Sequence, residues 1–167
     1  YKVAWCRLGF KPHFAVVSDV EDPDLGTKPV VPGDHYMFIA TESKYEAHFL
    51  CALLNSSVYQ RSLKDIVSQG KASLSKTVVS QLELPEWTET EQSTRLAELS
   101  MAAHDIVADY LDQHTRDGTI TLSKRAYNET TIDELAVVQG EIDSLVEEML
   151  ADEGLFPGVG QTDLSSF

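Results

Sequence analysis

The sequence predicts an α+β fold in which a small mixed β-sheet with flanking helices precedes a long antiparallel α-helical hairpin. Three observations predict it: β-prone runs separated by turn-forming residues up to residue 40, helical spacing of apolar residues from residue 42, and heptad spacing in two long segments after Trp87. We expect an α+β domain over residues 1–87, a helical hairpin over residues 88–152 and a flexible tail over residues 153–167.

The strands are predicted by short β-prone runs. Residues 1–19 contain two of these runs, and Lys11-Pro12 between them indicates a hairpin turn. Residues 20–33 hold prolines, glycines and acidic turn formers, a composition that favours a loop. Residues 35–40 are apolar and predict a third strand.

A capped helix over residues 42–54 follows the third strand. Thr41 or Ser43 can accept hydrogen bonds from the amides of its first turn, and Glu46 lies three residues after Ser43, as in a capping box. A second short helix is expected over residues 58–67, with Arg61 and Lys64 facing outward. We then expect a polar loop over residues 68–75, one or two helical turns over residues 75–81 and a short strand over residues 82–84.

Two long helices are predicted after Trp87, over residues 89–113 and 131–152. Apolar residues recur in both at alternating spacings of three and four, which is a heptad-like seam, and Asp117-Gly118 between them indicates a turn. Two such helices most simply fold back as an antiparallel hairpin. The seam residues are Leu96, Leu99, Ala103, Ile106 and Tyr110, then Leu135, Val138, Ile142, Leu145 and Met149.

The net charge of −14 is unevenly distributed along the chain. Residues 1–87 carry nine Lys or Arg against ten Asp or Glu, whereas residues 88–167 carry four against seventeen. Phosphate contacts need Lys and Arg, so the split argues against the second half as a nucleic-acid surface and leaves the first half open. A solubilising, halophile-like surface explains the same acidic excess without any partner.

No combination of residues in the sequence is typical of a catalytic centre. The five histidines are scattered, and neither they nor the cysteines have the spacing of a zinc site. His48, beside an apolar helical stripe, is more typical of a satisfied, partly buried histidine than of a catalytic base. Residues 154–160 lack the lysine of a phosphate loop, and the Asn-Pro-Pro-aromatic motif of amino-methyltransferases is absent. We therefore expect no enzyme activity, metal or cofactor in this chain.

The sequence also predicts the cellular compartment. Cys6 and Cys51 lack CxxC spacing, which favours buried thiols in a reducing cytoplasm over a disulfide. No apolar run approaches the roughly 18–20 residues that a bilayer-spanning helix needs, and no basic-plus-apolar leader precedes the fold. Because the chain begins at Tyr1 rather than at a methionine, we expect it to be part of a longer protein, and the cysteine pattern favours the cytoplasm as the place of that protein.

One stretch of the first half favours a phosphate-rich partner. Residues 58–80 carry four basic residues against the single acid Asp65, and the loop over residues 68–75 within them adds serine hydroxyls, an amide and Gly70, which allows close backbone approach. Lysine can neutralise the phosphates of DNA, and serine can position a DNA strand by hydrogen-bonding to its backbone. Gln or Arg can hydrogen-bond to the edges of bases. A polar loop with a few lysines is also typical of plain solvated surface, so composition alone leaves both interpretations open.

The order of motifs is more specific than any single motif. An apolar strand leads into a helix that closes with Leu53-Leu-Asn-Ser-Ser57, and a basic helix, a glycine–serine loop, the phrase Leu82-Glu-Leu-Pro85 and a long helix from Glu91-Gln92 follow. This order, over residues 1–112, resembles the target-recognition domain shared by adenine-N6 DNA methyltransferases of restriction–modification systems and by type I specificity subunits. The opening Lys2-Val-Ala-Trp5-Cys-Arg7 is similar to the first strand of the recognition part of such methyltransferases.

The resemblance implies a half-barrel or mixed sheet-and-helix domain that binds double-stranded DNA from one groove and is not itself catalytic. A methyltransferase domain outside this chain would bind S-adenosylmethionine and flip the adenine, and a nuclease fused to that enzyme or partnered with it is compatible with the pattern. The implied phosphate contacts are Arg61, Lys64, Lys71 and Lys76. Ser68, Gln69, Ser73 and Ser75 are implied as base or backbone contacts, with Arg7, Lys11 and His13 as additions from the first hairpin.

Two features depart from the family pattern. Glu86-Trp87 replaces the usual polar or proline run after the strand, and the acidic load disfavours tight DNA binding by the fragment alone. By the same resemblance, the long acidic helices would be spacers or docking arms that face protein or water, where they can contact another subunit. The alternative function is a protein–protein interaction or dimerisation module built on the heptad helices, with the first half as scaffold.

Overall fold

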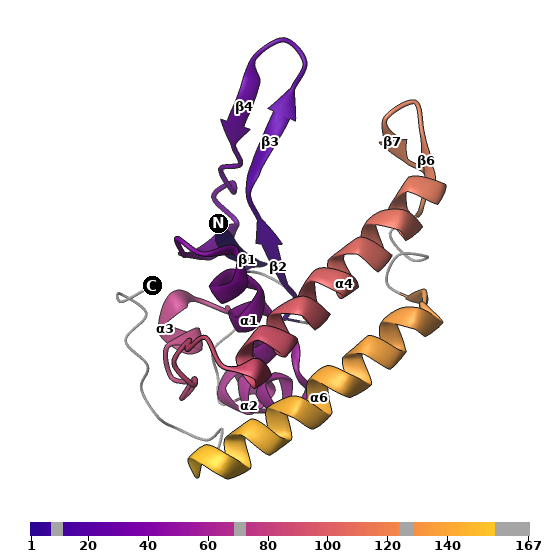
Figure 1. The fold of residues 1–167 in the computed structure, drawn as a ribbon. Coiled ribbons are helices and arrows are strands. Elements are labelled where there is room, and N and C mark those ends of the chain that lie inside the picture. The colour runs from indigo at the N-terminus through magenta and orange to yellow at the C-terminus, as the bar shows by residue number, and fades with distance from the viewer. Residues whose placement is uncertain (8–11, 69–72, 124–128, 156–167) are drawn as a thin grey trace.

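The structure, a computed structural model, describes residues 1–7, 12–68, 73–123 and 129–155. A three-stranded sheet packs against helices, and two β-hairpins stand away from this body (Figure 1). The sheet consists of β1 (Lys2–Cys6), β2 (Phe14–Val17) and β5 (Tyr36–Ala40) in the order β2-β1-β5. The α+β class is as predicted, but all strand pairings in the described part of the chain are antiparallel, so the expected mixed sheet is wrong.

The central strand β1 pairs with both of its neighbours through large apolar residues. Val3 lies opposite Val16 and Ile39, and Trp5 lies opposite Phe14. The rings of Trp5 and Phe14 have centroids 5.4 Å apart, and both side chains are buried. The predicted pairing of the first two strands as a hairpin is therefore confirmed.

A second hairpin occupies much of the segment for which the sequence predicted a loop, residues 20–33. β3 (Asp19–Asp22) pairs antiparallel with β4 (Gly26–Pro29). The Asp22 carboxylate accepts hydrogen bonds from the backbone N–H groups of Asp24 and Leu25, and Gly26 has a φ of 68°. The prediction was wrong because the clustered turn formers close one tight turn between two strands and leave the flanking residues extended.

A third, shorter hairpin confirms a sequence prediction. β6 (Thr115–Arg116) and β7 (Thr119–Ile120) pair antiparallel around Asp117 and Gly118. Both turn residues have positive φ, 50° and 72°, which is the conformation that an Asp-Gly hairpin turn requires.

Helix α1 (Lys44–Asn55) lies at the centre of the core. The Ser43 hydroxyl accepts the Glu46 N–H at 3.4 Å, so Ser43 rather than Thr41 is the N-cap. Every residue from 47 to 54 is buried, because α1 packs against β1, β2, α2 (Ser57–Ser68), α4 (Glu91–Gln113) and α6 (Asp133–Glu153). The sequence predicted a helix with one apolar stripe, whereas the helix is enclosed by neighbours.

The region after α2 is partly as predicted. The short helix α3 (Lys76–Val79) confirms the expected helical turn, and α3 packs against α2. The strand expected over residues 82–84 is wrong: Leu82 and Leu84 are buried in an irregular segment. The Leu82 N–H donates to the Val79 carbonyl at 3.0 Å, which continues the turn of α3 instead of joining a sheet.

The two long helices are α4 and α6, and α4 packs against both α1 and α6 (Figure 1). Leu96, Leu99, Ile142 and Met149 of the predicted seams are buried in the same cluster as the sheet residues. This cluster continues across residue 87, where we expected a domain boundary. No helix in the described ranges is long and apolar enough to cross a membrane.

Candidate nucleic-acid interface

The segment that follows α2 is hydrogen-bonded to the end of β1, the central strand of the sheet. The Leu74 N–H donates to the Arg7 carbonyl at 2.9 Å, and the Trp5 indole N–H donates to the Leu74 carbonyl at 2.8 Å. Leu74 itself is buried, 6% exposed, so its side chain adds an apolar contact to these two polar ones. Residues 69 positions apart in the sequence are thereby held side by side.

This anchor brings together polar residues from both ends of the first half. Arg7 is exposed beside the anchor, and Ser73 and Ser75, half-buried, flank Leu74 on either side. Lys76 is exposed at the first position of α3. The Ser75 hydroxyl does not cap α3, although its backbone carbonyl accepts the first bonds of that helix. Four of the residues implied by the resemblance thus share one region of the surface.

Basic side chains in this region are not neutralised within the described chain. Lys64 is exposed on α2, which packs against α3, the helix that carries Lys76. Neither these lysines nor Arg7 form an ion pair with any residue that the structure describes. Their charges are therefore available to a polyanion.

Arg61 stands apart from this group. Its Nε donates to the Ser57 carbonyl at 3.2 Å, and its guanidinium lies 4.0 Å from the Glu147 carboxylate on α6. Helix α6 carries eight acidic residues and no basic one. Arg61 is thus oriented toward the acidic helix, and the structure does not bring it together with Arg7 and Lys76.

The remaining predicted site residues are placed only in part. Lys11, Gln69 and Lys71 lie outside the described residues. Ser68 is the last residue of α2, and His13 is exposed just before β2. The region defined by Arg7, Ser73, Ser75 and Lys76 is called the basic face below, and Lys64 is exposed on α2, one helical turn from Arg61.

Sequence reasoning missed the structural role of the Leu53-Leu-Asn-Ser-Ser57 motif. The Asn55 amide pairs with β2: its Oδ1 accepts the Phe14 N–H at 3.1 Å and its Nδ2 donates to the Phe14 carbonyl at 2.8 Å. Both the N–H and the hydroxyl of Ser57 donate to the Asp143 carboxylate, at 2.8 and 2.6 Å. The motif therefore joins α1 to the sheet and α2 to α6.

A buried polar cluster joins α1, α4 and β2. The His48 Nδ1 lies 3.1 Å from the Ser100 hydroxyl, and the rings of His48 and His104 meet edge to face at 4.9 Å. The His104 Nε2 accepts the Val16 N–H at 3.0 Å, so its Nδ1 carries the proton and donates to the Ser100 carbonyl at 2.8 Å.

The chemistry of this cluster is that of a core contact. Burial, followed by the nearby His104 and Lys44, lowers the pKa of His48 to about 4. Burial raises the pKa of the Cys51 thiol to about 11, which disfavours the reactive thiolate. Ser100 is 3% exposed and His48 5% exposed, so a substrate cannot reach the pair. Cys51 is buried as predicted, whereas Cys6, also predicted to be buried, is exposed.

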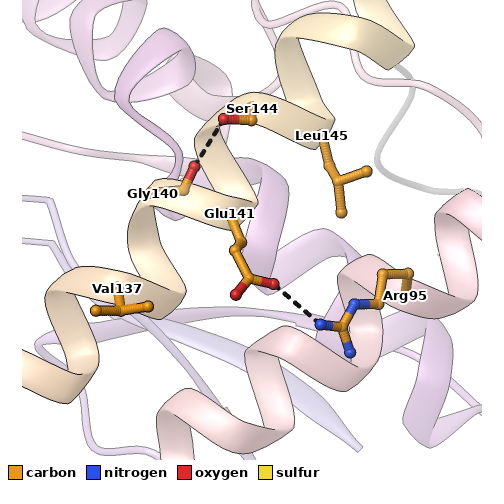
Figure 2. Close-up of a pocket in the computed structure, with 6 residues that line it drawn as sticks. All are labelled: Arg95, Val137, Gly140, Glu141, Ser144 and Leu145. Carbon is orange, nitrogen blue, oxygen red and sulfur yellow. Dashed lines mark hydrogen bonds and ion pairs between the residues drawn. The ribbon is translucent and has the colours of Figure 1, made fainter.

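A shallow groove of about 500 Å³ lies between α4 and α6 (Figure 2). Glu141 of α6 accepts a hydrogen bond from Arg95 of α4 at 2.9 Å, and Val137 and Leu145 lie along α6 on the two sides of this pair. The surrounding helices are acidic, which disfavours a nucleic-acid ligand. Among the described residues, no group of three or more His, Cys, Asp and Glu side chains is placed to hold a metal ion.

Comparison of the chain with protein-family models, with curated proteins and with solved structures finds no match.

Proposed function

We propose that this chain is the DNA target-recognition region of a restriction–modification adenine-N6 methyltransferase. The observation that carries the proposal is the anchor of Leu74 to Arg7 and Trp5, because it gathers residues implied by the family resemblance from opposite ends of the first half. Their exposed positive charges suit phosphates, and the serine hydroxyls between them suit backbone or base contacts.

The chain acts in this proposal by binding and orienting DNA. Arg7, Lys64 and Lys76 neutralise phosphates, while Ser73 and Ser75 hydrogen-bond to the DNA. Gln69 and Lys71 are further DNA contacts in this proposal, as the resemblance implies. Methyl transfer from S-adenosylmethionine belongs to a methyltransferase domain outside this chain, and α4 and α6 act as an acidic helical hairpin that faces protein or water.

The test is the salt dependence of duplex binding by the full-length enzyme. Three phosphate contacts predict a slope of about −3 in a plot of log affinity against log salt, and Lys76→Glu should reduce that slope by about one. Arg116→Glu is the matched control, because it makes the same change of charge at an exposed hairpin. A flat salt dependence, or equal effects of the two variants, would contradict the proposal.

A second candidate function is protein–protein association through the long helices. Val137 favours it, because this apolar side chain is 65% exposed on α6 beside the groove. The predicted seam itself is less suitable, since Ile142 and Met149 are buried against the chain's own core. Sedimentation of the protein with and without Val137→Asp tests this candidate: a monomer in both samples excludes self-association through this face.

A further inference from the structure

The β3–β4 hairpin, residues 19–29 and called the arm below, is a ribbon without a core of its own. β3 and β4 form a separate two-stranded sheet that projects from the body (Figure 1). All but one of the residues of its strands are exposed. A two-stranded hairpin alone is marginally stable in water, so burial against a partner would stabilise it.

The tip of the arm is nevertheless well formed. The Asp22 carboxylate holds the backbone N–H groups of Asp24 and Leu25, and Thr27 donates across the strands to Glu21. Leu25 is presented at the tip with 66% of its surface exposed, and Val20 is 51% exposed on the same ribbon. An ordered turn that displays an apolar residue is suited to insertion into a pocket.

The arm leaves the sheet at the end opposite to the basic face. In the β1–β2 pairing, Trp5 lies opposite Phe14 while Lys2 lies opposite Val17, and only Ser18 separates Val17 from the arm. Arg7 and the Leu74 anchor are at the other end of β1. The arm can therefore contact a second partner while the basic face contacts DNA.

The charge of the arm indicates what kind of surface it can bind. The arm carries four acidic residues and one basic residue, Lys28. The acidic residues are Asp19, Glu21, Asp22 and Asp24. This excess repels phosphates and attracts lysine and arginine. We propose that the arm docks on a basic protein surface with an apolar pocket for Leu25, on the methyltransferase domain of the same enzyme. The inference rests on the proposed function in taking the partner from that enzyme.

Carbodiimide cross-linking tests the docking, because it joins a carboxylate to a lysine only where the two are in contact. In the full-length enzyme without DNA, we expect cross-links from Glu21 or Asp24 to lysines outside residues 1–167, located by peptide mass spectrometry. Leu25→Asp should lower their yield about tenfold, the change that corresponds to the loss of one buried leucine contact.

Ile120→Asp is the matched control, because Ile120 is 52% exposed and lies on β7, in a hairpin separate from the arm. It should leave the cross-links unchanged. Cross-links confined to residues 1–167, cross-links to a second copy of the chain, or equal yields in the two variants would overturn the docking proposal. The salt dependence of DNA binding is measured separately, so failure of the arm and failure of the DNA-recognition proposal remain distinguishable.

Discussion

Asp143 shows how one side chain connects the two halves of the molecule. Its carboxylate accepts both the N–H and the hydroxyl of Ser57, at the first residue of α2, and also accepts the Gln139 amide at 2.9 Å. A carboxylate at this position acts as an N-cap supplied by another helix, because it satisfies a backbone donor that the helix leaves unpaired.

We predict that Asp143→Ala lowers the free energy of unfolding by about 1–2 kcal/mol, the usual effect of losing a helix cap. Urea denaturation followed by circular dichroism measures the change. Asp152→Ala is the control, because Asp152 is exposed on the same helix and the substitution removes the same charge. Equal losses in the two variants would show that charge, rather than the bonds to Ser57, determines the effect.

His48 makes the stability of the protein dependent on pH. Its folded-state pKa is lowered to about 4, so the unfolded chain takes up a proton at a higher pH than the folded chain. The contribution of neutral His48 is therefore complete above about pH 6.5 and is lost as the pH falls toward 4. Among the groups that face it, His104 and Lys44 lower its pKa, and Asp105 opposes them.

We predict that wild type loses roughly 3 kcal/mol more stability than His48→Gln between pH 7 and pH 4. Urea titrations at several pH values measure the difference. His114→Gln serves as the control, because His114 is only half-buried at the end of α4. Parallel pH profiles for wild type and His48→Gln would contradict the prediction.

At the scale of the element, local rules predicted more than pairing rules did. Ser43, one of the two caps that the sequence offered, is the N-cap of α1, and the helix begins two residues later than predicted. Asp117-Gly118 predicted the β6–β7 turn, because caps and turns depend on adjacent residues. The β3–β4 hairpin was missed because its strands are exposed on both faces and show no apolar alternation. Residues 82–84 were assigned wrongly because a short buried apolar run looks alike in a strand and in a loop.

The candidate site was predictable only as a set of residue types. The lysines and serines of residues 58–80 can be identified from composition, but the anchor that positions them cannot. It depends on Trp5 and Leu74, which are 69 positions apart and carry no motif that links them. The ion pair that turns Arg61 toward α6 depends likewise on a helix packing that the sequence does not specify.

Gly140 lies in the interior of α6, where glycine is unfavourable. A Cβ added at Gly140 would meet no heavy atom within 4 Å, and glycine in a helix costs about 1 kcal/mol relative to alanine. We predict that Gly140→Ala raises the free energy of unfolding by about that amount. Gly118→Ala should destabilise the protein instead, because Gly118 has a φ of 72°. Chemical denaturation of both variants checks the opposite signs.

At the scale of the whole molecule, the net charge of −14 opposes the compact state. Between 0.05 and 1 M salt the screening length falls from more than 10 Å to about 3 Å, which weakens repulsion between exposed carboxylates. We predict that KCl raises the thermal midpoint of the protein over this range. The same salt should weaken duplex binding, so stability and DNA affinity should change in opposite directions. A thermal midpoint that is independent of KCl would contradict this prediction.

The hydrogen bonds that join Leu74 to Arg7 and Trp5 affect which sequence changes the protein can accept during evolution. These bonds use the backbone of Leu74 and Arg7 and the indole of Trp5, so the side chains of Ser73 and Ser75 take no part in them. A gene that exchanges the codons of Ser73 and Ser75 would change what the basic face presents while both bonds remain. Under the proposed function, new DNA specificities then arise by substitution of residues that flank the anchor, in nature or by design, without refolding the domain.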